Sequence, residues 1–248
     1  MKEQIHTIPL NDAFLSGDEC PFCYLRRQAE QSTVRYVIGP GATYMEVDVR
    51  EETARTGFCT HHTKALYDYG NTLGNALILQ SYYQRMQALV EELTEDCAAP
   101  RRSLLRRNRQ AEPSRWGQLR ERTGQCFICQ RVDYHMDRYF ETFFLMIKDP
   151  EFRRRVEQSK GFCLEHFGEL MERAENTLPH AQREWFYSRI PVLMRENLSR
   201  VREDLDWLIA KYDHRNAGAD WKNSRDALPR AMEKMQSLHP TDPPYRET

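Results

Sequence analysis

The stretch GQCFICQRVDYHMDRYFETFFLMIKDPEFRRRVEQSKGFCLEHF, residues 124–167, carries three cysteines and a histidine at two short spacings. Cys126 and Cys129 form a C-x-x-C pair, and Cys163 and His166 follow in the pattern G-F-C-x-x-H. Side chains of this kind can bind a metal ion, form a redox dithiol, or serve as small apolar fillers. The rest of the sequence decides between these interpretations.

The same pattern occurs earlier in the chain. Cys20 and Cys23 form a first C-x-x-C pair, and Cys59 and His62 follow in a first G-F-C-x-x-H. The spacers are 35 and 33 residues long, and equivalent cysteines lie 106 and 104 positions apart. An ordered set of eight potential ligands that occurs twice indicates an internal duplication and favours metal binding.

The sequence around these motifs predicts helices. After Cys126, apolar residues recur every three or four positions as far as Asp149-Pro150, which is typical of an amphipathic helix. Residues 181–212 carry a second long stripe of this kind, in which Pro191 predicts a kink. The first stripe contains Ile128, Val132, Met136, Tyr139, Phe143 and Met146, and the second contains Phe186, Ile190, Leu193, Leu198, Val201, Leu205, Leu208 and Tyr212.

The first copy of the pattern is also predicted to be helical. Residues 20–38 read as a helix that ends at Gly39-Pro40-Gly41, and a single long helix is expected from Cys59 to about Leu93. The small polar residues at 71–75 suggest close packing or a kink within that helix. Since no convincing alternating strands occur, we predict an all-α protein with two pseudo-repeated helical halves, each with a Cys3His metal site, and a C-terminal helical arm.

The chain is predicted to divide at changes in composition. Residues 98–122 contain eight arginines against two glutamates, which favours a solvated linker or a surface helix, with phosphate contact to nucleic acid as the alternative. The expected parts are a first helical unit (1–97), the Arg-rich segment (98–122), a second helical unit (123–180), the helical arm (181–238) and a disordered tail (239–248).

Overall composition limits the classes of partner. The 248 residues include 36 basic and 37 acidic side chains, so no overall charge attracts the chain to nucleic acid or to a membrane. No apolar run approaches the roughly 18 residues that a membrane-spanning helix needs. We therefore expect a cytoplasmic protein without a membrane partner, in which the seven cysteines are more suited to metal binding than to disulfides.

The motifs lie where helix starts are expected. Gly57 and Gly161 would permit a turn, Phe58 or Phe162 would anchor it in the core, and the next cysteine would occupy a first helical turn. Unpaired N–H groups and the positive helix end stabilise thiolates there. Three thiolates and one imidazole suit tetrahedral structural zinc, so we expect two Zn ions, with two iron-sulfur clusters as the alternative.

The spacing leaves open how the four motifs combine. Each site can form within one repeat or by exchange between the two. We interpret the helix between the second pair of motifs as a spacer that folds Cys163 and His166 back onto Cys126 and Cys129.

Other site types fit the sequence less well. A dithiol redox centre normally accompanies alternating strands and helices, and it would leave Cys59, His62, Cys163 and His166 without a role. A di-iron carboxylate site of the helical-bundle kind needs a Glu-x-x-His on each of two helices, and the sequence contains this pattern only once, at Glu3 and His6. His61 could replace His62 as a ligand, but the second repeat has a glutamate at that place. No catalytic residue is assigned.

The sequence resembles the bacterial domain-of-unknown-function family 6062. The resemblance covers about residues 8–238 and rests on runs such as CPFCYLRRQAE, NTLGNALIL, CFICQRVDYHMDRYFETFF and KDPEFRRRVEQSKGFCLEHF. It implies the same eight marked positions: Cys20, Cys23, Cys59, His62, Cys126, Cys129, Cys163 and His166. The resemblance implies no activity, and its link to anaerobic bacteria adds weight to the iron-sulfur alternative.

Three functional hypotheses follow. The first is a non-enzymatic helical scaffold, held together by two zinc sites, that binds a protein partner of unknown identity. The second is an iron-sulfur electron-transfer or accessory protein. The third is a thiol or metal-dependent enzyme, which would need one metal to keep an open coordination position.

Overall fold

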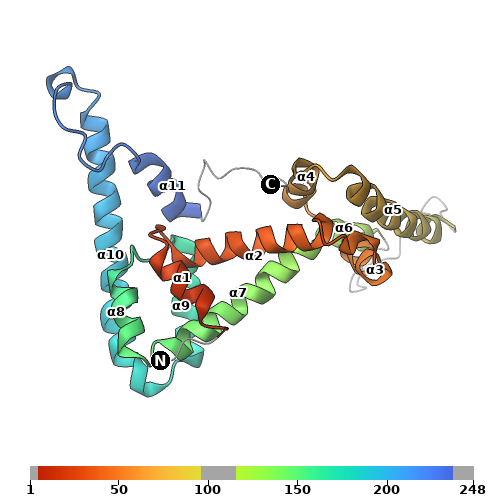
Figure 1. The fold of residues 1–248 in the computed structure, drawn as a ribbon, viewed down its shortest axis with the longest axis horizontal. Coiled ribbons are helices and arrows are strands. Elements are labelled where there is room, and N and C mark those ends of the chain that lie inside the picture. The colour runs from red at the N-terminus through yellow and green to blue at the C-terminus, as the bar shows by residue number, and fades with distance from the viewer. Residues whose placement is uncertain (1–4, 96–115, 237–248) are drawn as a thin grey trace, which may run out of the picture. The chain divides into compact units, whose positions relative to one another are not determined.

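A computed structural model describes residues 5–95 and 116–236 of the chain. These residues form α-helices and two short 3-10 helices, with no strands among them, so the predicted all-α class is confirmed (Figure 1). The helices are α1 (Ile8–Leu15), α2 (Pro21–Ile38), α3 (Val47–Thr56), α4 (Thr60–Tyr69), α5 (Thr72–Thr94), α6 (Gly117–Thr123), α7 (Phe127–Met146), α8 (Pro150–Gln158), α9 (Leu164–Thr177), α10 (His180–Ala210) and α11 (Ala227–Gln236).

Helix ends follow the local sequence signals, with one correction. The Asp149 side chain accepts a hydrogen bond from the Glu151 N–H and caps α8, and α2 ends just before Gly39, as predicted. The expected single helix from Cys59 to Leu93 is wrong. Gly70 has a φ of 92° and ends α4, and the Asn71 side chain caps α5 by accepting from the Gly74 N–H.

The chain divides into two compact units that do not follow its linear order. Of the described residues, unit 1 combines 5–29 with 133–236, and unit 2 contains 30–95 and 116–132. Among the described residues, unit 1 therefore includes α1 and α8–α11, and unit 2 includes α3–α6. Both α2 and α7 contribute their first residues to one unit and their later residues to the other.

Unit 1 has an aromatic core. Phe22 stacks on Phe140 with ring centroids 4.2 Å apart, and Phe162 packs beside Phe22 at 5.8 Å. All three rings are fully buried. Helices α10 and α11 pack against each other, as do α9 and α11 (Figure 1). This core surrounds the segments that carry Cys20 and Cys163.

The long stripe predicted for residues 181–212 is only partly buried. Phe186, Ile190, Leu193 and Val201 lie in the core of unit 1, and α10 continues through Pro191. Leu198 is 37% exposed, and Tyr212, which follows the end of the helix, is 86% exposed. In unit 2, α5 packs against α3 and α4.

Some sequence expectations fall outside the described residues. These are most of the Arg-rich segment 98–122 and the tail 239–248. Cys97, which belongs to neither copy of the cysteine and histidine pattern, also lies outside the described residues. The end of the Arg-rich segment is described and forms α6.

Candidate metal sites

Four ligand side chains gather in unit 1 to form what we call the buried site. The Sγ atoms of Cys20, Cys23 and Cys163 lie 3.5, 3.4 and 3.2 Å from Nδ1 of His166. All four residues are buried, and their ligand atoms lie within 4.8 Å of one another. A single ion at the centre of this group would contact three sulfurs and one ring nitrogen.

A second group of four gathers in unit 2, which we call the half-exposed site. The Sγ atoms of Cys59, Cys126 and Cys129 lie 3.2, 3.3 and 3.3 Å from Nδ1 of His62. Cys126 and His62 are buried, whereas Cys59 and Cys129 are only partly buried. The donor set is the same as in unit 1, but two of its cysteines are less deeply buried.

The structure pairs the four motifs crosswise. The first C-x-x-C meets the second C-x-x-H, and the second C-x-x-C meets the first C-x-x-H. The interpretation that Cys163 and His166 fold back onto Cys126 and Cys129 is therefore wrong. The 20 residues of α7 span about 30 Å, and the 9 residues of α8 return only about 14 Å. The second C-x-x-H consequently lies near the far end of α7, where Phe140 contacts Phe22 of the first C-x-x-C.

All four motifs lie at helix starts. The carbonyls of Cys20, Cys59, Cys126 and Cys163 each accept the first helical hydrogen bond from the N–H four residues later, at 2.9–3.2 Å. Cys59 and Cys163 occupy the N-cap position, one residue before the expected first turn, which places the histidine three residues later beside the sulfur. The motif spacing therefore sets the local geometry of the ligands.

The predicted turns before α4 and α9 are present. Gly57 and Gly161 have φ values of 69° and 75°, which glycine adopts without strain. Phe162 is fully buried, as expected for an anchor, whereas Phe58 is only partly buried. The turn in unit 2 is also bonded to α7, since the Phe127 N–H donates to the Gly57 carbonyl at 2.9 Å.

The observed separations fit a tetrahedral ion. Zinc bonds of about 2.3 Å to sulfur and 2.0 Å to nitrogen place sulfur and nitrogen roughly 3.5 Å apart and two sulfurs about 3.8 Å apart. The sulfur–nitrogen separations are 3.2–3.5 Å, and the Cys59 and Cys129 sulfurs lie 3.9 Å apart. Four protein ligands complete such a tetrahedron, so neither group leaves an open position on a four-coordinate ion.

Electrostatics in the half-exposed site favour a thiolate beside a protonated imidazole. Burial raises the pKa of Cys126, but the hydrogen bond to His62 lowers it to about 6. Burial lowers the pKa of His62, but hydrogen bonds to Cys126 and Glu30 raise it to about 10. Burial and the neighbouring Cys126 raise the pKa of Cys129. A cation that replaces the shared protons therefore meets one sulfur that is already a thiolate.

The cysteines and the histidine of the buried site also form a thiolate beside a protonated imidazole. Hydrogen bonds from Cys20 and Cys23 hold the pKa of Cys163 far below its usual value, and hydrogen bonds to Cys163 and Cys20 raise that of Cys23. Burial lowers the pKa of His166, and hydrogen bonds to Cys163 and Cys20 raise it to about 10. One anion is thus shared by three sulfurs next to a cationic ring.

The two sites differ in the surroundings of Nε2, the histidine ring nitrogen that does not face the sulfurs. His62 contacts Glu30 through Nε2 at 2.7 Å, and His61 contacts the same oxygen at 3.0 Å. Such a carboxylate fixes the ring orientation and makes the histidine a more basic ligand. Within the described residues, Nε2 of His166 is buried and has no hydrogen-bond partner. Met136 stands 106 positions after Glu30, the offset that relates Cys20 to Cys126, so the second repeat has an apolar residue at the equivalent place.

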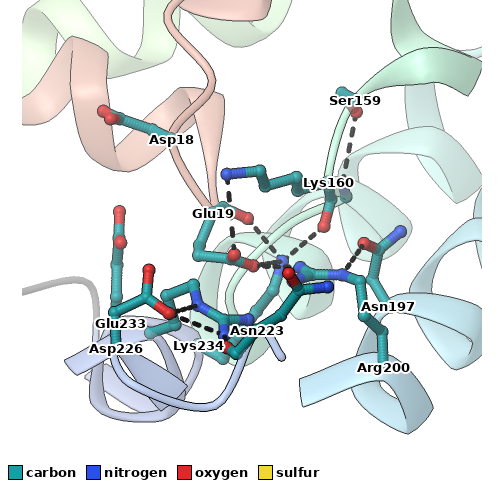
Figure 2. Close-up of polar contacts among 12 residues, drawn as sticks. Asp18, Glu19, Ser159, Lys160, Asn197, Arg200, Asn223, Asp226, Glu233 and Lys234 are labelled. Carbon is teal, nitrogen blue, oxygen red and sulfur yellow. Dashed lines mark hydrogen bonds and ion pairs between the residues drawn. The ribbon is translucent and has the colours of Figure 1, made fainter. Parts of the chain in front are cut away.

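A lysine from α11 holds the backbone around the buried site (Figure 2). Nζ of Lys234 donates to the carbonyl of Glu19, to that of Lys160 at 2.5 Å and to that of Phe162 at 3.4 Å. It also lies 3.3 Å from the Glu19 carboxylate, which Arg200 contacts at 2.5 Å. Lys234 and Glu19 are almost fully buried. One ammonium group thus joins the segments immediately before Cys20 and Cys163.

This lysine provides a link that the backbone cannot form here. In unit 2, the N–H of Phe127 bonds to the Gly57 carbonyl and connects the two motifs of the half-exposed site. The equivalent residue in the first C-x-x-C is Pro21, which has no N–H. In unit 1, the contacts of Lys234 on both sides of Gly161 connect the two motifs instead.

Sequence reasoning identified the eight candidate ligands but missed Glu30 and Lys234. No local motif marks either residue, although the repeat offset would have shown that Glu30 lacks a counterpart. His61 lies beside the half-exposed site and contacts Glu30, whereas its ring is 59% exposed. The six described cysteines are all free of disulfides.

Across the described residues, no helix combines the length and apolar character needed to cross a membrane.

Comparisons with known proteins are consistent with the resemblance found in the sequence. Neither the curated proteins nor the solved structures contain a match to this chain. The family model for DUF6062, a family of unknown function, matches residues 1–242. The chain therefore belongs to the DUF6062 family.

Proposed function

We propose that the protein is a non-enzymatic helical scaffold, held together by two structural zinc ions. The observation that carries the proposal is the pair of four-ligand groups, each of which joins helix starts from distant parts of the sequence. Structural zinc sites characteristically contain four protein ligands from cysteine and histidine. Metal binding to such groups contributes directly to the free energy of folding.

Ligand spacing supports zinc over the alternatives. An iron-sulfur cluster places several iron and sulfide atoms between its ligands, which requires wider separations than a single ion does. Both groups keep all four ligand atoms within 4.8 Å. A thiol redox centre would use each C-x-x-C alone, whereas here every pair is completed by a cysteine and a histidine. An enzyme would need an open metal position, which a fourth protein ligand removes.

Metal and sulfide analysis of anaerobically purified protein tests this proposal. We expect about two zinc ions per chain, no acid-labile sulfide and no visible absorbance band, because zinc is a d¹⁰ ion. The control is a variant with Cys97 replaced by serine, which removes a cysteine outside both groups and should bind the same amount of zinc. A brown preparation that contains iron and sulfide would refute the zinc assignment.

We also propose that the scaffold acts in the cytoplasm and binds an amphipathic helix of a partner protein. An apolar stripe on α5 supports this proposal. Leu79, Tyr83 and Val90 are 39%, 69% and 43% exposed, and Met86 between them is partly buried. Their spacings of four, three and four residues are those by which one helix packs along another. Buried Ile78 lies on a different face of α5.

A charge placed in the stripe should weaken partner binding without changing the zinc content. Chemical cross-linking in the native cells identifies proteins that contact α5, and titration with the purified candidate measures affinity. We expect Tyr83→Glu to weaken binding at least tenfold, because a buried carboxylate loses its hydration. Gln84→Glu, on an exposed position of the same helix, is the matched control. Equal affinities for both variants would exclude this surface.

A further inference from the structure

The two sites differ in how deeply their cysteine residues are buried. Cys20, Cys23 and Cys163 of the buried site are all buried, whereas Cys59 and Cys129 of the half-exposed site are only partly buried. Thiolates react with oxidants according to their exposure and charge. The same donor set thus has two different exposures within one chain.

The two partly buried cysteines are also neighbours. The Sγ atoms of Cys59 and Cys129 lie 3.9 Å apart, although the residues are 70 positions apart in the sequence. A disulfide requires a sulfur–sulfur distance of about 2.0 Å, so the side chains need to approach by about 2 Å. Both cysteines lie at helix starts, Cys59 at the N-cap of α4 and Cys129 in the first turn of α7.

We propose that Cys59 and Cys129 form a peroxide-sensitive modification site whose oxidation releases the zinc ion of the half-exposed site. This inference rests on the proposed zinc function. One thiolate attacks hydrogen peroxide, the O–O bond breaks, and a sulfenic acid and hydroxide form. The second thiolate attacks the sulfenic sulfur, the S–S bond forms, and a second hydroxide leaves.

The overall reaction is balanced. Two thiolates lose two electrons in forming the disulfide, and peroxide takes up these electrons together with two protons to give two water molecules. The zinc ion then keeps only Cys126 and His62 of its four ligands. These two remaining ligands fill only half of a four-coordinate shell, so the ion dissociates into solvent.

The buried site should resist the same treatment. Its four ligands are all buried, and His166 packs beside the stacked rings of Phe22 and Phe140, at centroid distances of 5.9 and 6.2 Å. Lys234 holds the backbone segments of its two motifs together. Peroxide therefore has no comparable approach to these sulfurs.

Peroxide treatment of the zinc-loaded Cys97→Ser variant tests the inference. Zinc is counted before treatment, the released ion is followed with a chromogenic indicator, and peptide mapping locates new disulfides. We expect one of two zinc ions to be released, together with a Cys59–Cys129 disulfide, and dithiothreitol with added zinc to restore the original content. Release of both ions or neither, or oxidation at other cysteines, would overturn the inference.

Failure of the inference can be distinguished from failure of the proposed function. A preparation that contains two zinc ions and loses neither with peroxide contradicts only the modification site. A preparation without zinc before treatment contradicts the proposed function itself. A second variant, Cys129→Ser, should show no disulfide at Cys59, whatever amount of zinc it retains, and a disulfide there with another cysteine would contradict the assignment of the pair.

Discussion

Replacing Cys20 and Cys163 together by serine is expected to leave one zinc ion per chain, whereas replacing Cys20 and Cys59 together removes both. The reason is the crosswise pairing of the motifs. Cys20 and Cys163 belong to the same site, so the double variant destroys only one site. Cys20 and Cys59 belong to different sites, although they lie in the same sequence repeat.

Stability should follow zinc content. Structural zinc sites contribute about 10 kcal/mol or more of binding free energy, which is comparable to the roughly 5–15 kcal/mol by which a folded domain is stable. We therefore expect Cys20→Ser/Cys59→Ser to lose most of its helical circular dichroism. The Cys20→Ser/Cys163→Ser variant should keep unit 2 folded. Zinc analysis and thermal denaturation check both results, and the reverse pattern would indicate pairing within each repeat.

Replacing Lys234 by methionine is expected to destabilise the buried site by about 3–5 kcal/mol, as when one member of a buried ion pair is removed. The change removes one cation from beside the Glu19 carboxylate. It also leaves three backbone carbonyls without the hydrogen bond that Lys234 donates to them. The segments before Cys20 and Cys163 then lose their common contact. Urea denaturation measures the free energy, and zinc loss to a chelator shows whether the buried site is affected.

Lys64→Met is the matched control for this prediction. It makes the same chemical change at a side chain that is 70% exposed and pairs with Asp68 one helical turn away. Exposed pairs of this kind contribute about 0.3–0.5 kcal/mol. If Lys234→Met lowers stability but both zinc ions leave at the rate of the control, Lys234 supports the fold and has no particular role at the metal.

The candidate ligands could be predicted from the sequence because their spacing carries the information. A C-x-x-C or C-x-x-H places two side chains beside one helix start, and this geometry depends only on nearby residues. The pairing of the motifs depends on tertiary packing, and the two alternatives use identical spacings. The length of α7 was the available signal, since 20 helical residues extend over about 30 Å and the following motif comes only after them in the chain.

Other features could not be predicted for different physical reasons. Lys234 bonds to backbone carbonyls, which every sequence provides, and the carboxylate that it contacts, Glu19, is 215 positions away, so no local motif marks it. The break between α4 and α5 did have a local signal, because Gly70-Asn71 combines a helix-ending residue with a capping residue. The apolar periodicity on both sides concealed that signal.

The crosswise pairing also has a consequence for the order in which a growing chain can fold. Cys20, Cys23, Cys59 and His62 leave the ribosome first, so a nascent chain offers four ligands before the second half of either native site has been made. The native contact between Cys20 and His166 spans 146 residues, against 39 between Cys20 and Cys59. Closing the longer loop costs only about 1 kcal/mol more. An ion that the first four ligands bind early can therefore move to the native ligand sets once residue 166 has been made, because the cost in chain entropy is small.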